Sequence, residues 1–537
     1  MPSTDHDMAP ANVSRFLQRA ARAHPHRRAV VTPHGRDGGG RVSYVHLTFE
    51  QLDRESDRLA RGLDRVGIGR GTRTIVMVRP SLAFFVLTFA VFKAGAVPVM
   101  VDPGMGLRRM LACFQECRPE AFIGIPVAHV LRKLRPGFFR SVKRWVTVGR
   151  RWFWGGFTLT GLMDSDDSPF AAVEPAADET AAILFTTGST GPAKGVVYTH
   201  SVFGAQIESI RSHYGITAGE IDLPTFPLFA LFDPALGMTA VIPDMDPTRP
   251  ARVDPRKIIE AITNQGVTNM FASPALLHRV GRYGRRHGIQ LPSLKRVISA
   301  GAPIMPSNIE QFSSMLVGDA QVHTGYGATE AMPVASIAGG EILSETRPLT
   351  EQGRGVCVGR PLADIRVRIL EISDAPIPDI SSARILDDGS VGEITVQGPP
   401  VTRRYYQRPE ADALAKIAED KTVWHRMGDL GRIDAAGRIW FYGRKSHRVI
   451  TSGGTLFTIP CEAIFNNHPS VYRSALVGVG RPPRQRPVIC IEPYDKHVDR
   501  EQLTGELLET AGRSELTRMI DTVLFPPEFP VDIRHNS

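Results

Sequence analysis

Hydroxyl, glycine and lysine side chains follow one another along residues 186–195, which makes this stretch suited to holding a phosphate group. A strand-like apolar run, residues 181–185, precedes it. Hydroxyl donors, a sharply turning backbone whose N–H groups can approach an anion, and one lysine charge together favour phosphate binding. The residues predicted to bind phosphate are Thr186, Thr187, Gly188, Ser189, Thr190, Gly191 and Lys194, of which Thr187 and Lys194 are also predicted to be catalytic.

The loop differs from a P-loop. A Walker A sequence reads G-x-x-x-x-G-K-[ST] and opens a helix, whereas Lys194 precedes Gly195 and a second apolar run, residues 196–198. We therefore expect the loop to be the tip of a hairpin. A surface loop with a chance lysine is the alternative that the motif alone leaves open. Residues 183–200 as a whole resemble the phosphate-loop signature of the adenylate-forming superfamily, which includes acyl-CoA synthetases, luciferases and the adenylation domains of peptide synthetases.

Further stretches resemble signatures of this superfamily and occur in the expected order along nearly the whole chain. The first is residues 297–303, which end a strand in a turn of small residues. The resemblance implies that its backbone packs against adenine, and small residues suit close approach to a flat base. Gly301, Ala302 and Pro303 are the nucleotide-binding residues expected here.

A second signature is residues 325–330. The resemblance implies that the ring of Tyr326 stacks on adenine, that Thr329 holds the α-phosphate and that Glu330 binds Mg²⁺. A carboxylate suits Mg²⁺, which takes few protein ligands beside phosphate oxygens and water. Gly325 and Gly327 complete this part of the expected nucleotide site, and Thr329 and Glu330 are also expected to be catalytic.

A third signature is residues 427–431. The resemblance implies that Asp429 accepts hydrogen bonds from both ribose hydroxyls, with Arg444 as a further ribose contact. One carboxylate can accept from two neighbouring O–H donors. A turn-forming aspartate after glycine is the structural alternative.

Aromatic residues alternate with prolines and small residues along residues 223–238, where the superfamily lines its acyl pocket. Such a run is often simple core, so a pocket and a core are equally expected. Ala230 stands where many relatives carry a larger side chain, which would leave room for a branched or long acyl group. The predicted substrate-binding residues are Phe229, Ala230, Phe232 and Met238.

Strands alternate with helices in the first half of the chain, and this pattern predicts an α/β fold with a largely parallel sheet. The resemblance implies a large N-terminal α/β domain of layered sheets and helices, residues 1–445, and a small mobile C-terminal α+β cap domain, residues 446–537. Because no lysine follows Lys496, we expect the cap to end before the family's catalytic lysine.

Composition excludes several classes of protein. The chain has 537 residues, 42% hydrophobic and 22% charged, as expected of a soluble globular protein. The net charge is +9, but the arginines are scattered and form no basic stripe, so a nucleic-acid partner is not expected. Residues 82–101 are apolar but broken by a lysine, a glycine and a proline, so we expect no membrane span. Five scattered cysteines favour the cytoplasm.

Residues 229–251, 453–469 and 529–537 look like the β-lactone synthetases of bacterial long-chain olefin biosynthesis. The resemblance implies that ATP, with Mg²⁺, adenylates a long-chain 2-alkyl-3-hydroxyalkanoic acid. The substrate's own 3-hydroxyl would then close a β-lactone and release AMP, after diphosphate has left. His200 is the nearest candidate base, although a histidine that ends a strand is more often structural. A complex with other enzymes of olefin biosynthesis is a further expectation.

Two other functions remain open at this stage. A long-chain fatty acyl-CoA ligase would share every nucleotide signature and differ only in its product. A catalytically silent acyl- or nucleotide-binding member of a complex is the second alternative, because the terminal lysine is missing.

Overall fold

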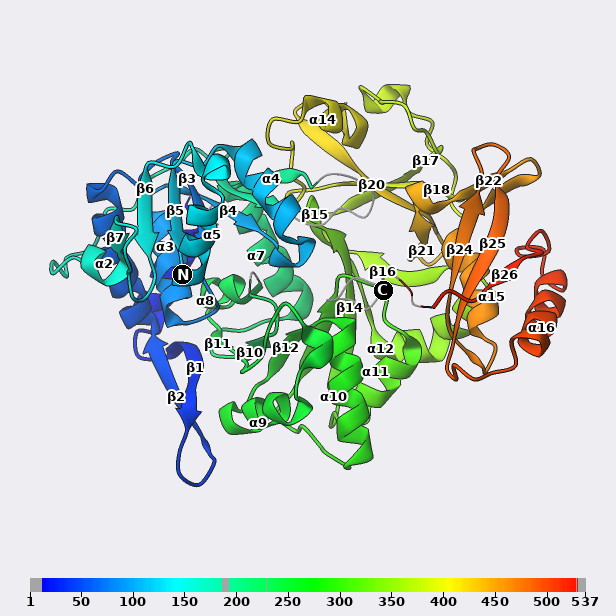
Figure 1. Cartoon of the computed structure of the whole chain (residues 1–537), viewed down its shortest axis with the longest axis horizontal. Helices are drawn as coiled ribbons and strands as arrows, with labels where there is room; N and C mark the ends of the chain where they lie inside the picture. Colours follow the sequence, from blue (N-terminus) through cyan, green and yellow to red (C-terminus); the bar gives the residue numbers. More distant parts are fainter. Residues whose placement is uncertain (1–11, 186–192, 228, 528, 530–537) are drawn as a thin grey trace, which may run out of the picture.

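The structure, a computed structural model, describes residues 12–185, 193–227, 229–527 and 529. Helices and strands alternate through much of the chain, which confirms the predicted α/β class (Figure 1). Two large sheets and their helices form most of the molecule, and the last part of the chain builds two small sheets at one side of it, drawn in orange and red.

A seven-stranded sheet occupies the N-terminal side of the molecule (Figure 1). Its neighbours are parallel except for the last pair, β8 and β9, which form the predicted hairpin around the phosphate loop. In spatial order its strands are β7 (Phe157–Thr158), β6 (Arg144–Thr147), β5 (Ala121–Gly124), β3 (Arg73–Met77), β4 (Val97–Val101), β8 (Thr180–Phe185) and β9 (Gly195–Thr199).

A fourteen-stranded sheet runs through the rest of the large part. The path from β1 to β14 is parallel, and the path from β14 to β17 is antiparallel. In spatial order its strands are β17 (Arg366–Leu370), β18 (Gly392–Gln397), β20 (Thr422–Ile433), β21 (Ile439–Arg444), β16 (Val356–Pro361), β15 (Ala331–Ala338), β14 (Gln321–Ala328), β13 (Arg296–Ala300), β12 (Asn269–Ala272), β10 (Ile221–Pro224), β11 (Thr239–Val241), β1 (Arg28–Arg36) and β2 (Val42–Thr48), with β19 (Lys416–Glu419) beside β20. Because β10, β12, β13 and β14 are parallel, their carboxyl ends meet at one edge of the sheet, where a site can form.

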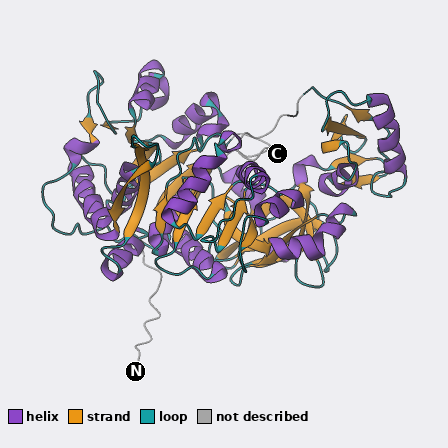
Figure 2. Cartoon of the chain, turned by 90° about the horizontal axis from the view of Figure 1, so that it is seen from below, coloured by secondary structure: helices purple, strands orange, loops and turns teal. Residues whose placement is uncertain are grey.

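Helices cover the sheets on both sides (Figure 2). Thr48 caps α2 and forms a capping box with Gln51. The helices of the large part are α1 (Ser14–Ala23), α2 (Phe49–Arg65), α3 (Leu82–Lys93), α4 (Leu107–Cys117), α5 (Pro126–Leu134), α6 (Leu159–Leu162), α7 (His200–Tyr214), α8 (Phe232–Leu236), α9 (Pro255–Gln265), α10 (Pro274–Arg286), α11 (Pro306–Ser313), α12 (Gly339–Glu341), α13 (Arg347–Glu351) and α14 (Pro409–Ala415).

Helix α3 is apolar on all sides because it lies inside the protein. Its one charged residue, Lys93, has a fully buried side chain. The Lys93 ammonium group contacts carboxylate oxygens of Asp53 at 2.5 Å and Asp57 at 2.7 Å, both on α2. The buried charge is thus paired, and the pair ties α3 to α2. No helix in the described ranges is both long and apolar enough to cross a membrane.

The last part of the chain has a hydrophobic core of its own, built around Phe465, Ile489 and Leu507. Its elements are β22 (Val449–Thr451), β23 (Gly454–Leu456), α15 (Thr458–Asn466), β24 (Val471–Val479), β25 (Arg486–Pro493), α16 (Arg500–Gly512) and β26 (Val523–Leu524). The division after residue 445 and the mobility of this small part stay predictions.

Candidate active site

A cavity of about 550 Å³ lies where the carboxyl ends of the parallel strands meet the phosphate-loop hairpin. Residues of three predicted nucleotide signatures line one end of it, together with Lys194, which directly precedes β9. The apolar side chains of the predicted acyl pocket line the rest. The nucleotide end is lined by Lys194, Gly301, Gly325, Tyr326, Gly327, Thr329, Glu330 and Arg444.

The phosphate loop itself, with Thr186, Thr187, Gly188, Ser189, Thr190 and Gly191, lies outside the described residues. Its lysine is described. The Lys194 side chain is exposed, and its ammonium group lies 5.0 Å from the centre of the Tyr405 ring. An ammonium group over an aromatic face is held without a full counter-charge, so it can still attract a phosphate.

Glu330 is held at the cavity from two sides. Its Oε1 accepts a hydrogen bond of 2.7 Å from the Tyr405 hydroxyl. Its backbone carbonyl accepts from the amide of Thr402 at 2.8 Å and from the Thr402 hydroxyl at 2.9 Å. Tyr198 adds a hydrogen bond of 2.6 Å to the neighbouring carbonyl of Thr329. The turn after β14 is therefore fixed, and the Glu330 carboxylate faces the nucleotide end.

Segment 401–406 connects the two halves of the nucleotide end. Val401 bridges Ala331 beside Glu330, and Tyr405 bridges Val196 beside the phosphate loop. Tyr406 also donates its amide to the carbonyl of Gly195 at 2.7 Å. This segment was not identified from the sequence, because its contacts join strands that are far apart in the chain.

Asp429 is buried and bound by two predicted nucleotide contacts. Its Oδ2 accepts from the Tyr326 hydroxyl at 2.7 Å, and its Oδ1 accepts from the Arg444 guanidinium at 2.8 Å. Burial raises the pKa of Asp429, and Arg444 and Tyr326 oppose that shift. Asp429 itself does not belong to the described cavity lining, whereas the neighbouring Gly428 does. The structure therefore brings Tyr326, Asp429 and Arg444 together at the edge of the nucleotide end.

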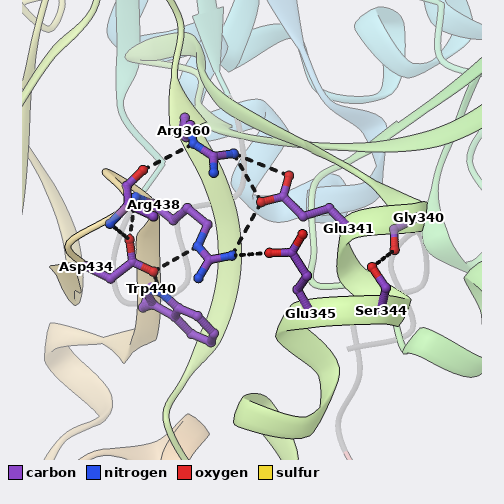
Figure 3. A network of polar contacts seen from close by, with 9 residues as sticks. Gly340, Glu341, Ser344, Glu345, Arg360, Asp434, Arg438 and Trp440 are labelled. Carbon is purple, nitrogen blue, oxygen red and sulfur yellow. Dashed lines mark hydrogen bonds and ion pairs between the residues drawn. The ribbon is translucent and has the colours of Figure 1, made fainter.

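A network of ion pairs fixes the hairpin that carries Asp429 and Arg444 (Figure 3). The two residues are directly paired across β20 and β21. At the far end of β21, Arg438 contacts Asp434 at 2.8 Å, and the Trp440 indole also donates to Asp434 at 2.8 Å. Arg438 further contacts Glu345, which lies in residues 342–346, at 3.0 Å. The register of the hairpin, and with it the Asp429–Arg444 pair, is thus anchored outside the cavity.

The predicted adenine-binding turn is only partly at the cavity. Gly301 lines it and has a positive φ of 99°, which glycine adopts without strain. The described lining does not include Ala302 or Pro303. The expected contact of the backbone of residues 301–303 with adenine stays a prediction.

Phe229, Phe232 and Met238 line the acyl end, as expected. The Phe229 ring stacks on Phe271 with the ring centres 4.1 Å apart. Ala230 is fully buried in a core cluster that includes residues of α2 and α3, and the described cavity lining does not include it. Its expected role of leaving room for an acyl group stays a prediction.

His200 begins α7, and its surroundings favour a structural role over that of a base at the site. The side chain is buried, and its Nδ1 lies 3.2 Å from the backbone amide of Val13, which donates to it. Burial lowers the pKa of His200 to about 4. The described cavity lining does not include His200.

The polar residues of the cavity that were missed at the sequence level include Gln206, Asp222, Asp233 and Asn269. All four are at least nine-tenths buried. Asp233 could have been noticed in the sequence, because it is a lone acid within the apolar run of residues 229–238. Asp222 and Asn269 meet only through strand pairing, which the local sequence does not specify.

Comparison with known proteins gives a consistent result. The family model described as AMP-binding enzyme matches residues 17–406. A protein of Xanthomonas campestris named olefin beta-lactone synthetase is 49% identical over 535 residues, covering 98% of this chain and 95% of the relative. A protein of the same name from Stenotrophomonas maltophilia is 50% identical over 537 residues, covering 98% and 96%. A long-chain-fatty-acid–CoA ligase of Thermus thermophilus is 26% identical and covers 97% and 92%.

Solved structures resemble the whole chain. The amide bond synthetase McbA from Marinactinospora thermotolerans has a TM-score of 0.79 at 22% identity, covering 97% of each chain. The O-succinylbenzoate coenzyme A synthetase MenE from Bacillus subtilis, in complex with AMP, has a TM-score of 0.75 at 19% identity, covering 97% and 96%. At these identities the likeness concerns the fold.

Proposed function

Because the chain belongs to the family of AMP-binding enzymes, we propose that it activates a long-chain 2-alkyl-3-hydroxyalkanoic acid with ATP and closes it to a β-lactone. It is an AMP-forming ligase with the adenylate-forming fold, a large N-terminal and a smaller C-terminal domain. The observation that carries the proposal is the 49–50% identity to two olefin β-lactone synthetases over almost the whole chain, against 26% for the fatty acyl-CoA ligase.

In the first step the substrate carboxylate attacks the α-phosphorus of ATP. A bond forms between a carboxylate oxygen and phosphorus, and the bond to the bridging oxygen breaks, so diphosphate leaves with its electron pair. The cation of Lys194 and the donors of the phosphate loop would stabilise the negative charge that builds up on these oxygens. Asp429, Arg444 and Tyr326 would hold the nucleoside beside them.

Glu330 fits a Mg²⁺ site that shares its ligands with phosphate. No group of three or more His, Cys, Asp or Glu side chains able to hold a metal ion occurs in the part of the chain that the structure describes. Mg²⁺ commonly binds through one or two carboxylates and substrate phosphates, and the Glu330 carboxylate is held toward the cavity by Tyr405. The ion, when bound, would neutralise phosphate charge; Glu330 would position it.

In the second step the 3-hydroxyl oxygen attacks the carbonyl carbon of the acyl adenylate. The new carbon–oxygen bond closes a four-membered ring, AMP leaves with the electrons of the acyl–oxygen bond, and the hydroxyl proton is released to water. The reacting groups belong to one molecule, so a cavity that holds the substrate folded replaces an external nucleophile. No thiol is consumed.

Product analysis tests this function. The protein is incubated with ATP, Mg²⁺ and a long-chain 2-alkyl-3-hydroxy acid, with and without CoA, and the organic products are identified by mass spectrometry. We expect a β-lactone in both mixtures. A thioester formed only with CoA would identify an acyl-CoA ligase, and an absence of product in both would favour a silent binding role. A cytoplasmic location and a complex with other enzymes of olefin biosynthesis belong to the same proposal.

A further inference from the structure

The acyl end of the cavity is deep, and its depth can be read from strand register. Asp222 in β10 pairs with Asn269 in β12, and Asn269 pairs with Arg296 in β13. At the nucleotide end, Ala300 in β13 pairs with Gly325 in β14. Arg296 and Ala300 are four residues apart on β13. At about 3.3 Å per residue, the Asp222–Asn269 pair therefore lies roughly 13 Å along the strands from Gly325 at the nucleotide end.

This deep end is polar although the cavity around it is apolar. Asp222, Asp233 and Asn269 line the cavity, and they are 2%, 4% and 4% exposed. The side-chain amide of Asn269 donates a hydrogen bond to Oδ1 of Asp222. Asp233, from α8, lies against Asp222; burial and the Asp222 carboxylate both raise the pKa of Asp233, so this residue carries the proton of the pair.

Two acceptor atoms of this cluster have no partner among the described residues. They are Oδ2 of Asp233 and Oδ1 of Asn269. Buried polar atoms are nearly always hydrogen-bonded, because an unmade hydrogen bond destabilises the protein. The deep end is therefore built for a ligand that donates hydrogen bonds.

We propose that Asp222, Asp233 and Asn269 form a binding site for a hydroxyl group carried on the distal part of the acyl chain. The inference rests on the proposed function and adds a substrate class to it. Acceptor atoms select an O–H donor over a carbonyl, an ether or a methyl group. The 3-hydroxyl that closes the lactone cannot be this ligand, since it must stay beside the activated carbonyl at the nucleotide end. A chain that ends in a methyl group at this depth would leave the acceptors without partners.

The test compares two series of 2-alkyl-3-hydroxy acids that are identical except for a terminal hydroxyl or a terminal methyl group. Diphosphate release gives kcat/KM for each acid, and the products are checked for β-lactone. At the chain length that reaches the deep end we expect the hydroxyl-ended acid to be preferred by at least about tenfold. Activity with methyl-ended acids and no preference at any length would overturn this inference alone. No activity with either series would overturn the proposed function, and the inference with it.

Variants assign the preference to the cluster. Asp233→Leu removes one acceptor and the acid pair, and we expect it to abolish the preference for the hydroxyl-ended acid. Asp233→Asn keeps the shape and an acceptor oxygen, so it should retain the preference and serves as the folded comparison if the leucine variant is unstable. The matched control is Met238→Leu on the apolar wall, which should change both acids alike. An Asp233→Leu protein that keeps the full preference would contradict the assignment.

Discussion

The hydroxyl of Tyr405 donates a hydrogen bond of 2.7 Å to Oε1 of Glu330, while the ring of the same tyrosine lies 5.0 Å from the ammonium group of Lys194. Burial, with the charge of Glu330, raises the pKa of Tyr405, so the phenol stays protonated and can only donate to the carboxylate. One side chain thus joins the predicted Mg²⁺ ligand to the predicted phosphate-binding lysine.

Tyr405→Phe keeps the ring and removes this hydrogen bond. Because hydrogen bonds to charged groups contribute about 1.5–3 kcal/mol, we expect kcat/KM for adenylation to fall by about tenfold or more. The Mg²⁺ concentration for half-maximal activity should rise, since the carboxylate is no longer oriented. The control is Tyr406→Phe, because the hydroxyl of Tyr406 makes only a long contact of 3.5 Å with the side chain of Gln407. An unchanged Mg²⁺ dependence in Tyr405→Phe would contradict the positioning role.

Asp429→Asn tests the ribose contact. The amide replaces one acceptor oxygen by a donor and removes the charge that Arg444 pairs with at 2.8 Å. We expect KM for ATP to rise by about tenfold. The wild-type protein should prefer ATP to its 2′-deoxy analogue, and the variant should lose most of that preference. Equal discrimination by both proteins would show that Asp429 does not bind the ribose.

Much of the fold follows from local sequence. The β8–β9 hairpin was predictable because two apolar runs flank a loop of small residues. Helix α2 begins at a capping box, and the threonine and glutamine that form it, Thr48 and Gln51, stand three residues apart in the sequence. The division of the apolar residues 82–101 into α3 and β4 also follows from the sequence. A glycine and a proline interrupt the apolar stretch, so it is not one continuous membrane span.

The site was predictable only where a signature names the residue. Glu330, Tyr326 and Arg444 do line the cavity, and their partners Tyr405 and Thr402 were missed because they come from a distant segment. The direction in which a side chain points was also hard to predict from the sequence. Ala230 faces the core, in a short helical turn whose period the local pattern does not reveal.

His200→Asn distinguishes a structural histidine from a base. Its Nδ1 accepts from the backbone amide of Val13 inside the protein, and an asparagine oxygen can only partly replace that acceptor. We expect the melting temperature to fall, as for a loss of about 1–2 kcal/mol, while the pH profile of kcat keeps its shape. A large loss of kcat with unchanged stability would instead identify His200 as a base.

Glu462, on α15, predicts a pH-dependent stability in the last part of the chain. Burial raises its pKa to about 7, while one oxygen accepts from the amide of Leu476 at 3.0 Å. In the unfolded chain Glu462 ionises near the ordinary glutamate pKa of 4.5. The stabilisation of the fold that comes with a protonated Glu462 is therefore fully present below about pH 4.5, and it is lost as the pH rises to about 7.

Glu462→Gln should remove this loss. Calorimetry from pH 4 to pH 8 should show the melting temperature of the variant rising relative to wild type up to neutrality and then staying level. The full effect is on the order of 3 kcal/mol. The control is Glu509→Gln, an exposed position on α16, which should show no such trend. A difference between Glu462→Gln and wild type that is independent of pH would contradict the prediction.

In the proposed reaction ATP adenylates the substrate carboxylate, and the substrate's own hydroxyl then captures the activated carbonyl. Isotope tracing tests it most directly. A 2-alkyl-3-hydroxy acid whose two carboxylate oxygens carry a heavy isotope is converted with ATP and Mg²⁺, and both products are weighed by mass spectrometry. We predict one heavy oxygen in AMP and one in the lactone carbonyl, with an unlabelled ring oxygen. Unlabelled AMP together with a lactone that keeps both heavy oxygens would mean that the hydroxyl had been activated instead, and would contradict the account.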